Sequence, residues 1–560
     1  MYSLLQAWAL PAALLAIVNL TATWYNVVSN KVPEPYLDEF FHVPQAQKYC
    51  IRDYSWDPKI TTPPGLYLVS KFLEPLLGCD TSSLRALNAG ALCLICPLSY
   101  GILRILRGRI NPGQQEPIDE KTIEEKSVVI DPTIVLDAHS ALNIALFPPL
   151  FFFSALYYTD VMSTLVVLLS YSAFLKKSSA SGSILENINA VCIGIMALFF
   201  RQTNIFWVAV FPAGLAVVNA LKGDNFSAVG TTRGDTSAVI RRSWDKGVIH
   251  DCSIQDARPQ DIALFLVSLP IAALKNIFLI MRVAVPYITL LALFVTFVVW
   301  NGSVVLGDKS AHTATIHIPQ MLYFWPYIAF FSAPLIVGLL LQPLLPLLPK
   351  PLRTLCNDNF NISSNMAMPT VLISTLIIVG GLAAVHFNTI IHPYTLADNR
   401  HYVFYVFRIL RQHPAIKYLA VPVYFACAWL TIQSLASSRD GEETTRSRRI
   451  ARPTSDKADR PPCQVSFITI WLVTTALSVI TAPLVEPRYF IVPWIIWRLH
   501  LPYTPASLSK DKTAGKVSYD MRLGLETVWL LAINVVVMYI FLYRGFAWPS
   551  EPGMVQRFIW

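Results

Sequence analysis

The sequence predicts an all-α polytopic membrane protein. Of its 560 residues, 54% are hydrophobic and only 14% are charged, against roughly 25% charged residues in soluble domains. Apolar runs of about 20 residues recur from one end of the chain to the other, and each is long enough to cross a bilayer as a helix. The basic residues lie mainly between these runs, as membrane orientation requires. The formal net charge of +9 is therefore no sign of nucleic-acid binding.

The apolar runs predict about 13 membrane-spanning helices, within a range of about 12–14. The first run is too long for a signal-peptide core and has no basic residues before it, so it is interpreted as an uncleaved span. Lys275 and Arg282 interrupt the apolar run 261–300, and 262–281 is therefore interpreted as an interfacial or re-entrant helix. The predicted spans are 4–28, 84–106, 134–157, 161–175, 184–200, 204–221, 283–301, 322–341, 368–388, 414–435, 464–483, 489–504 and 524–544.

The loops between the spans fall into two classes. One class is polar and rich in Lys and Arg, and the positive-inside rule places it in the cytosol with the N-terminus; it comprises 107–133, 176–183, 222–260, 342–366, 437–462 and 508–522. The other class is compact and carries acids, histidines, amides and aromatic residues on the non-cytosolic side; it comprises 28–83, 157–160, 201–204, 302–321, 389–401 and 484–488. The chain is predicted to form one membrane domain, 1–560, in which 222–260 and 437–462 are variable cytosolic loops.

The first non-cytosolic loop, 28–83, holds the densest group of chemically useful side chains. In a helix, Asp38, His42 and Gln45 recur at i, i+4 and i+7 and share one face. Glu39 lies about 100° further round the helix. One of the two acids can therefore do chemistry while the other holds the helix in place.

Later parts of this loop add a second polar site and two cysteines. Trp56 and Asp57 lie among aromatic rings and prolines, which favours a rigid, folded loop over a solvated one. Cys50 and Cys79 can form a disulfide if this side of the membrane is oxidising. The CxxC at 93–96 lies inside an apolar run without other ligands, so it is interpreted as packing rather than as a redox or metal site.

The other non-cytosolic loops contribute charges of both signs. Polar side chains at the ends of spans are costly unless they line a cavity, so they indicate a functional site. Acids beside cations suit the transfer of a group from a phosphate-activated donor, because a carboxylate accepts the proton of the entering hydroxyl and the cations hold the departing phosphate. These residues are Asp160, Asp308, Asp398, Glu486, Lys309, Arg201, Arg400, Arg488, His312, His317, His392 and His401.

Two other interpretations of these loops stay open. His312 and His317 form a plausible ligand pair for a metal, although their spacing is less specific than an HExxH motif. A transporter with a substrate site at the membrane midplane is the second alternative. Against it, the polar groups cluster at one surface, the spans contain few charges, and the sequence shows no internal repeat.

Six motifs, in this order along 38–493, together resemble the endoplasmic-reticulum α-1,2-glucosyltransferase family, which is similar to the wider GT-C group of polytopic glycosyltransferases. They are DEFFHVPQAQKYC, WDPKITTPPGLYLVS, FRQTNIFW, GDKSAHTATIHIPQMLY, HPYTLADNRHYVFYVF and LVEPRYFIVP. The sequence departs from the family pattern at Pro487 and Phe407, and the segment between Cys50 and Trp56 is short for the family.

The resemblance implies a GT-C-like fold with a lumenal catalytic cavity in the endoplasmic-reticulum membrane. It implies transfer of glucose from dolichyl phosphate β-D-glucose to diglucosylated Man9GlcNAc2-diphosphodolichol, which forms the terminal α-1,2-linked glucose used in protein N-glycosylation. Since a β-linked donor gives an α-linked product, the transfer is inverting and needs one general base. A mannosyltransferase of the GT-C group is the rival within this class. No metal or cofactor is implied, and protein partners stay undetermined.

The resemblance also implies roles for individual residues. Asp38 is the expected base, because the first acid of its motif aligns with the acidic motif of the wider group, and Glu39 is the alternative. Arg400 is the first choice for the donor phosphate, since a guanidinium fork fits phosphate oxygens; His401, Arg488 and Arg201 are expected to support it. The acceptor glycan is expected to contact His42, Gln45, Trp56, Asp57, His312 and His317.

Overall fold

The computed structural model describes residues 2–108, 133–178, 182–222, 236–309, 315–341, 346–351, 353, 369–436, 463–482, 484–503 and 519–560. Within these ranges the chain is helical almost throughout, and the strands that they contain form one short hairpin. The prediction of an all-α membrane protein is confirmed. The predicted loop 437–462 and part of 222–260 lie outside the described residues.

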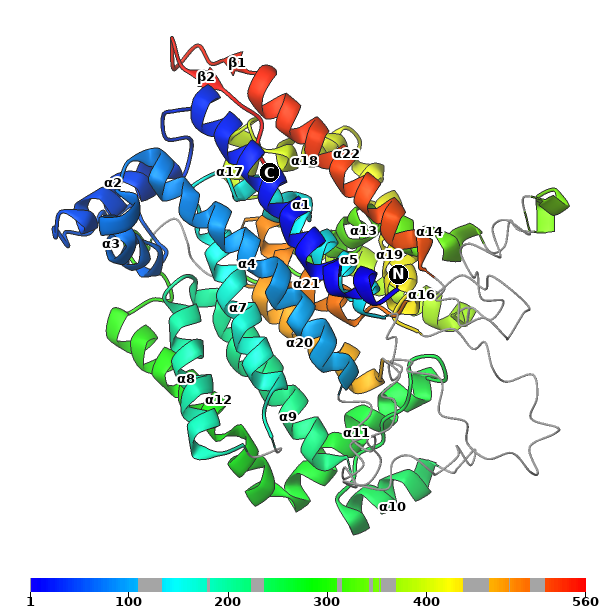
Figure 1. Cartoon of the computed structure of the whole chain (residues 1–560). Helices are drawn as coiled ribbons and strands as arrows, with labels where there is room; N and C mark the ends of the chain where they lie inside the picture. The colour runs from blue at the N-terminus through cyan, green and yellow to red at the C-terminus, as the bar shows by residue number, and fades with distance from the viewer. Residues whose placement is uncertain are drawn as a thin grey trace.

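The first half of the chain forms a bundle with a small helical pair at one end. Its elements are α1 (Tyr2–Lys31), α2 (Glu39–Cys50), α3 (Gly65–Leu77), α4 (Thr81–Gly108), α5 (Thr133–Ala145), α6 (Pro148–Phe153), α7 (Thr159–Leu175), α8 (Ile184–Leu198), the 3-10 turn η1 (Gln202–Asn204), the π-helical turn η2 (Phe206–Val210) and α9 (Phe211–Leu221). Helix α4 packs against α1, α5 and α7, and α7 packs against α8. The pair α2 and α3 lies at the left of the bundle in Figure 1, where α3 packs against α4.

The second half completes the bundle and returns to the first half. Its elements are α10 (Thr236–Lys246), α11 (Pro259–Lys275), α12 (Ile277–Asn301), α13 (Pro319–Phe331), α14 (Ala333–Leu341), α16 (Val371–Asn388), α17 (Pro393–Ala397), α18 (Tyr402–Arg411), α19 (Pro414–Gln433), α20 (Val465–Val479), the 3-10 turn η4 (Pro487–Phe490), α21 (Ile491–His500), α22 (Met521–Tyr543), β1 (Phe546–Ala547) and β2 (Val555–Gln556). Helix α12 packs against α8 and α9, and α22 packs against α5, α6 and α14.

Helices occupy every predicted span, but their lengths differ. Within the described ranges, seven helices are long and apolar enough to cross a membrane, or eight if α13 and α14, bent by 95°, form one span. The predicted span 134–157 is split into α5 and α6, because Pro148 and Pro149 lack the N–H groups that a continuous helix needs. Helix α11 ends at Lys275 and α12 begins at Ile277, so the helix predicted over 262–281 ends earlier than expected, and its interfacial position stays a prediction. The total of about 13 crossings stays a prediction.

Loops of one predicted class contact one another at one end of the bundle, and loops of the other class contact one another at the opposite end. At one end, Gln202 Nε2 donates to Thr61 O at 2.8 Å, which joins two loops predicted to be non-cytosolic. At the other end, Ile254 N donates to Cys463 O at 2.9 Å and joins two loops predicted to be cytosolic. Figure 1 shows α2, α3 and the β1–β2 hairpin along one side and α10 with the N-terminus along the other. The side of the membrane that each end faces stays a prediction.

A tight backbone contact joins the segment after α12 to the first non-cytosolic loop. Asp308 N donates to Pro58 O at 2.6 Å, and Leu306 N donates to Thr61 O at 3.2 Å. Gly307 between them has a φ of +63°, and a Cβ atom at this position would collide with Pro58 O. Glycine is therefore required here for both backbone conformation and space.

We expect Gly307→Ala to lower the thermal stability of the purified protein markedly. Gly302→Ala is the matched control, since its φ of +67° is equally left-handed but an added Cβ would come no closer than 3.7 Å to Lys309 Nζ. The control should cost only the left-handed strain of about 1–2 kcal/mol. Thermal unfolding in detergent measures both variants, and equal midpoints would show that the contact with Pro58 is unimportant.

Candidate active site

Glu39, the first residue of α2, is a fully buried anchor. Its Oε1 atom accepts from Arg85 Nε at 2.8 Å and from Tyr157 N at 2.6 Å. Its Oε2 atom accepts from Arg85 Nη2 at 2.6 Å and from Tyr36 N at 3.0 Å. Both side chains of this ion pair have 0% exposure. Four donors surround the carboxylate, so it is positioned to hold the start of α2 rather than to meet a substrate.

Asp38, immediately before α2, is arranged in the opposite way. Its side chain keeps 42% of its surface accessible and accepts from Arg488 Nη1 at 2.9 Å. The preceding residue, Leu37, has a φ of +54°, which is a strained conformation for a non-glycine residue. Burial of the surrounding site raises the pKa of Asp38, but the charge of Arg488 outweighs that effect and holds the pKa below its ordinary 3.8. Asp38 is therefore an ionised carboxylate with room for a ligand.

Two arginines and three acids form the charged centre of the site. Arg488 Nη2 lies 2.7 Å from Glu486 Oε2, and its Nη1 lies 3.7 Å from Asp160 Oδ2 in addition to its bond with Asp38. Arg201 Nη1 lies 2.9 Å from Asp160 Oδ1 as an ion pair without the alignment of a hydrogen bond. Asp160 is buried and thus links the two guanidinium groups.

Arg400 is occupied by its own neighbours. Its Nε donates to Asp398 Oδ1 at 2.9 Å and its Nη2 donates to Asp398 Oδ2 at 2.7 Å. Its Nη1 donates to Gln556 Oε1 at 3.0 Å, and the guanidinium carbon lies 4.4 Å from the centre of the Trp548 ring. The fork expected to bind phosphate is therefore already closed on a carboxylate and packed on an indole.

The segment 546–560, which was not among the predicted site segments, holds this part of the site together. His401 Nδ1 donates to Trp560 O at 3.0 Å. The Tyr36 hydroxyl donates to Arg557 O at 2.6 Å and accepts from Arg557 N at 2.7 Å. The segment thus connects the start of the first non-cytosolic loop with the residues around Arg400. Its cluster of aromatic residues was the available signal.

His42 and Gln45 share a face of α2 with Asp38, as predicted, but they make contacts within the protein. His42 Nδ1 lies 2.5 Å from the Tyr67 hydroxyl. Burial lowers the pKa of His42 below 6.5 and outweighs the attraction of Asp38, so the ring is neutral near pH 7. Gln45 donates to Ser55 O at 2.8 Å and accepts from Asp57 N at 3.0 Å. Gln45 therefore fixes the loop that follows α2.

The rest of this loop is held by local bonds. Trp56 is partly buried and donates to Ile60 O at 3.3 Å, while Asp57 Oδ1 accepts from Lys59 N at 2.9 Å. A disulfide joins Cys50 to Cys79 and closes the loop, in line with the sequence-based expectation. Trp56 and Asp57 keep partly accessible surfaces, so contact with a glycan stays a prediction for both.

Two predicted histidines lie apart from this centre. His312 lies outside the described residues. The His317 ring is fully buried beside the end of α20 and has no hydrogen-bond partner in the described part of the chain. Burial lowers its pKa to about 4. A buried ring offers no face to a glycan, so the predicted contact of His317 with the acceptor is not supported.

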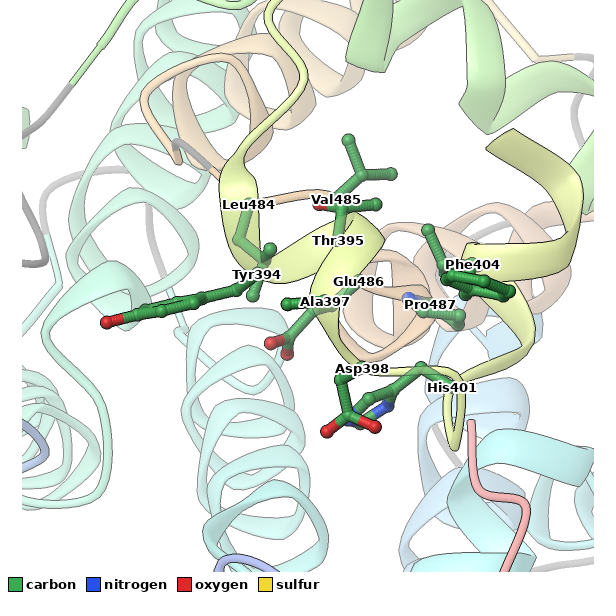
Figure 2. Close-up of a pocket in the computed structure, with 11 residues that line it drawn as sticks. Tyr394, Thr395, Ala397, Asp398, His401, Phe404, Leu484, Val485, Glu486 and Pro487 are labelled. Atoms are coloured by element: carbon green, nitrogen blue, oxygen red, sulfur yellow. The ribbon is translucent and has the colours of Figure 1, made fainter. Parts of the chain in front are cut away.

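A pocket of about 230 Å³ opens beside the charged centre. Residues of α17, α18 and the segment before η4 line it, and Figure 2 shows the carboxylates of Asp398 and Glu486 projecting toward the same side of the view. His401 also lines this pocket. Since Glu486 and Asp38 bind the same guanidinium group, Arg488, the pocket adjoins the accessible carboxylate.

Arg85 was not among the predicted site residues, although its position in the sequence carried a signal. Arg85 lies inside a predicted span, and an ionisable residue at such a position needs a partner. Its guanidinium group also donates to Val32 O at 2.6 Å and to Glu34 O at 3.1 Å. The residue therefore ties the first non-cytosolic loop to α4.

Fold and site together define a polytopic membrane transferase with an accessible carboxylate set among arginines. The chain belongs to the DIE2/ALG10 family, whose model matches residues 32–499. No solved structure matches the chain.

Curated relatives match the chain over nearly its whole length, and each is named as a Dol-P-Glc:Glc(2)Man(9)GlcNAc(2)-PP-Dol alpha-1,2-glucosyltransferase. The protein of Emericella nidulans is 40% identical, over 100% of this chain and 98% of its own length. That of Aspergillus fumigatus is 39% identical over the same shares. That of Mus musculus is 30% identical over 99% of both chains. The resemblance inferred from the motifs is confirmed.

Proposed function

We propose that this chain transfers glucose from dolichyl phosphate glucose to the diglucosylated dolichyl-diphosphate oligosaccharide and forms the terminal α-1,2 linkage. The relatives that it matches along nearly their whole length are named for this reaction. The structural observation that supports the proposal is the accessible Asp38 carboxylate 2.9 Å from Arg488. This pair places a proton acceptor beside a cation that can attract phosphate.

In the proposed mechanism, Asp38 is the general base of a single displacement. The acceptor hydroxyl gives its proton to the Asp38 carboxylate as its oxygen bonds to C1 of the donor glucose. The bond between C1 and the phosphate oxygen breaks, and its electron pair leaves with dolichyl phosphate. Attack from the face opposite the phosphate inverts the configuration. Positive side chains stabilise the departing phosphate, so the scheme needs neither a metal nor a cofactor.

We assign the phosphate to Arg201 instead of Arg400. Arg488, whose Nε and Nη2 bind Glu486 and whose Nη1 binds Asp38, adds positive charge nearby rather than free donors. Arg400 already has a carboxylate, an amide oxygen and an indole as partners. For Arg201, by contrast, the described residues provide one ion pair, through Nη1 to Asp160, and its side chain is 18% exposed. Its Nε and Nη2 groups therefore offer donors to a phosphate. Asp160 holds Arg201 and Arg488 in place.

This arrangement predicts an unusual pH dependence. Because Arg488 holds the pKa of Asp38 below 3.8, the base stays ionised until the pH falls through that lowered pKa. The kcat/KM of the wild type should therefore show no fall caused by protonation of Asp38 between about pH 7 and pH 4. In Arg488→Gln, burial acts on Asp38 without the cation and should move this fall to higher pH. Arg488→Lys keeps the charge and serves as the control. If kcat/KM fell at the same pH in the wild type, Arg488→Gln and Arg488→Lys, the result would contradict the electrostatic pairing of Asp38 with Arg488.

We further propose that the active site faces the lumen of the endoplasmic reticulum and that the N-terminus is cytosolic. The distribution of basic loops supports this orientation. A glycosylation acceptor inserted into 28–83 or 302–318 should be modified in cells, whereas one inserted into 437–462 should stay unmodified. A mobility shift removed by a glycosidase measures the modification. Modification within 437–462 would overturn the orientation.

The proposed reaction is tested by the lipid-linked oligosaccharides of cells that lack this chain. They should accumulate the diglucosylated species, because other enzymes add the preceding sugars. Re-expression of the wild-type chain should restore the fully glucosylated species. Accumulation of a species that lacks mannose would instead assign the chain to a mannosyltransferase reaction, and an unchanged profile would remove it from this pathway.

A further inference from the structure

The pocket beside the charged centre has a lining that suits one kind of ligand. Its described lining residues include two carboxylates and a histidine but neither lysine nor arginine. A phosphate would meet repulsion there. Tyr394, Phe404 and Val485 add apolar surface to Asp398 and Glu486. A mainly apolar wall with a few well-placed acceptors is the usual design of a site for a neutral, hydroxylated ligand.

Glu486 retains capacity to accept hydrogen bonds, whereas both oxygens of Asp398 already accept from Arg400. Arg488 Nε and Nη2 both donate to Glu486 Oε2, and within the described part of the chain no bond to Glu486 Oε1 appears. Each carboxylate oxygen offers two lone pairs. A pocket of about 230 Å³ is smaller than the roughly 300–1,000 Å³ of sites for drug-sized ligands. The available space thus suits about one sugar ring.

We propose that this pocket binds the terminal glucose of the acceptor, with Glu486 accepting a hydrogen bond from one of its hydroxyl groups. The proposal rests on the proposed function and adds a place for the acceptor. The sequence-based prediction put the glycan on residues of the loops 28–83 and 302–321 and gave Glu486 no contact with a substrate. Here the loop supplies the base, and the segments 394–404 and 484–487 hold the sugar.

The geometry around Arg488 favours the acceptor over the donor. Glu486 takes the Nε and Nη2 edge of the guanidinium group, whereas Asp38 and Asp160 lie at Nη1. Arg201, the proposed phosphate ligand, lies on the Asp160 side. The pocket and the phosphate are thus separated by Arg488. The base must contact the attacking hydroxyl of the acceptor, and Asp38 binds the same guanidinium group as Glu486, so the ring in the pocket is assigned to the acceptor.

A pocket-filling variant tests this assignment in the full-length protein. Ala397 lines the pocket and is exposed, so Ala397→Phe should block it without removing a hydrogen bond. We expect its KM for the oligosaccharide acceptor to rise by about 10-fold to 100-fold, the loss expected for hydrogen bonds to charged groups. Its KM for dolichyl phosphate glucose should be unchanged. Ala547→Phe, exposed in β1 outside the pocket, is the control and should match the wild type.

A binding measurement separates this proposal from the proposed reaction. Saturation-transfer NMR with methyl α-glucopyranoside should detect contact with the wild type and Ala547→Phe, and a reduced signal with Ala397→Phe. An equal signal in all three proteins, or a rise in the donor KM alone, would overturn the assignment to the acceptor. Loss of binding in Ala397→Phe together with a wild type that forms no glycoside would support the sugar site and reject the proposed reaction.

Discussion

Asp38→Asn is expected to lower kcat by about 10²-fold to 10⁴-fold, the usual contribution of a general base. The amide keeps the shape of the side chain but cannot accept the proton of the acceptor hydroxyl. Donor affinity should stay the same or increase, because Arg488 loses a carboxylate that competes with the phosphate. Single-turnover kinetics at saturating donor and a direct donor-binding measurement separate the two effects.

Asp53→Asn is the matched control for this experiment. Asp53 lies in the same loop and is exposed, and its carboxylate accepts hydrogen bonds from Ser55 within a local turn. Its substitution should leave kcat and both KM values unchanged. Near-normal turnover in Asp38→Asn would remove Asp38 as the base. Equal losses in both variants would show that the loop, rather than one carboxylate, limits the reaction.

The helical class and the position of the spans followed from hydrophobic run length, because a bilayer imposes one length scale on every span. Breaks within spans were harder to predict. The prolines at 148 and 149 were visible, yet the bend of 95° between α13 and α14 depends on packing that sequence spacing does not encode. The division of the loops into two classes at opposite ends of the bundle followed from their charge and composition.

The sequence indicated which residues belong to the candidate site but not which of their side chains bind one another. Asp38 is 450 residues from Arg488 in sequence, and the structure brings the two side chains within hydrogen-bonding distance. Arg400 was predicted to bind the phosphate, and its spacing from Asp398, two residues earlier, does not indicate that this carboxylate occupies the same fork. Only the fold decides which cation is left with donors for a substrate.

Glu39→Gln is expected to destabilise the protein strongly. The substitution leaves Arg85 as a buried charge without its partner, which typically costs about 3–5 kcal/mol. It also weakens the hydrogen bonds that Tyr36 N and Tyr157 N donate to this side chain. Because these bonds hold the backbone next to Leu37, whose φ is +54°, the start of α2 should relax. Thermal unfolding of the purified protein in detergent measures the effect.

The same experiment decides whether Glu39 anchors the site or acts as the base. Arg241→Gln is the control, because Arg241 and Asp245 form an exposed pair at 3.5 Å, and such pairs contribute little to stability. Its unfolding midpoint should equal that of the wild type. If Glu39 is the anchor, the midpoint of Glu39→Gln falls, and kcat recovers in part at temperatures where the variant is folded. A normal midpoint with abolished turnover would make Glu39 the base instead, and Asp38 would then be a ligand that orients Arg488.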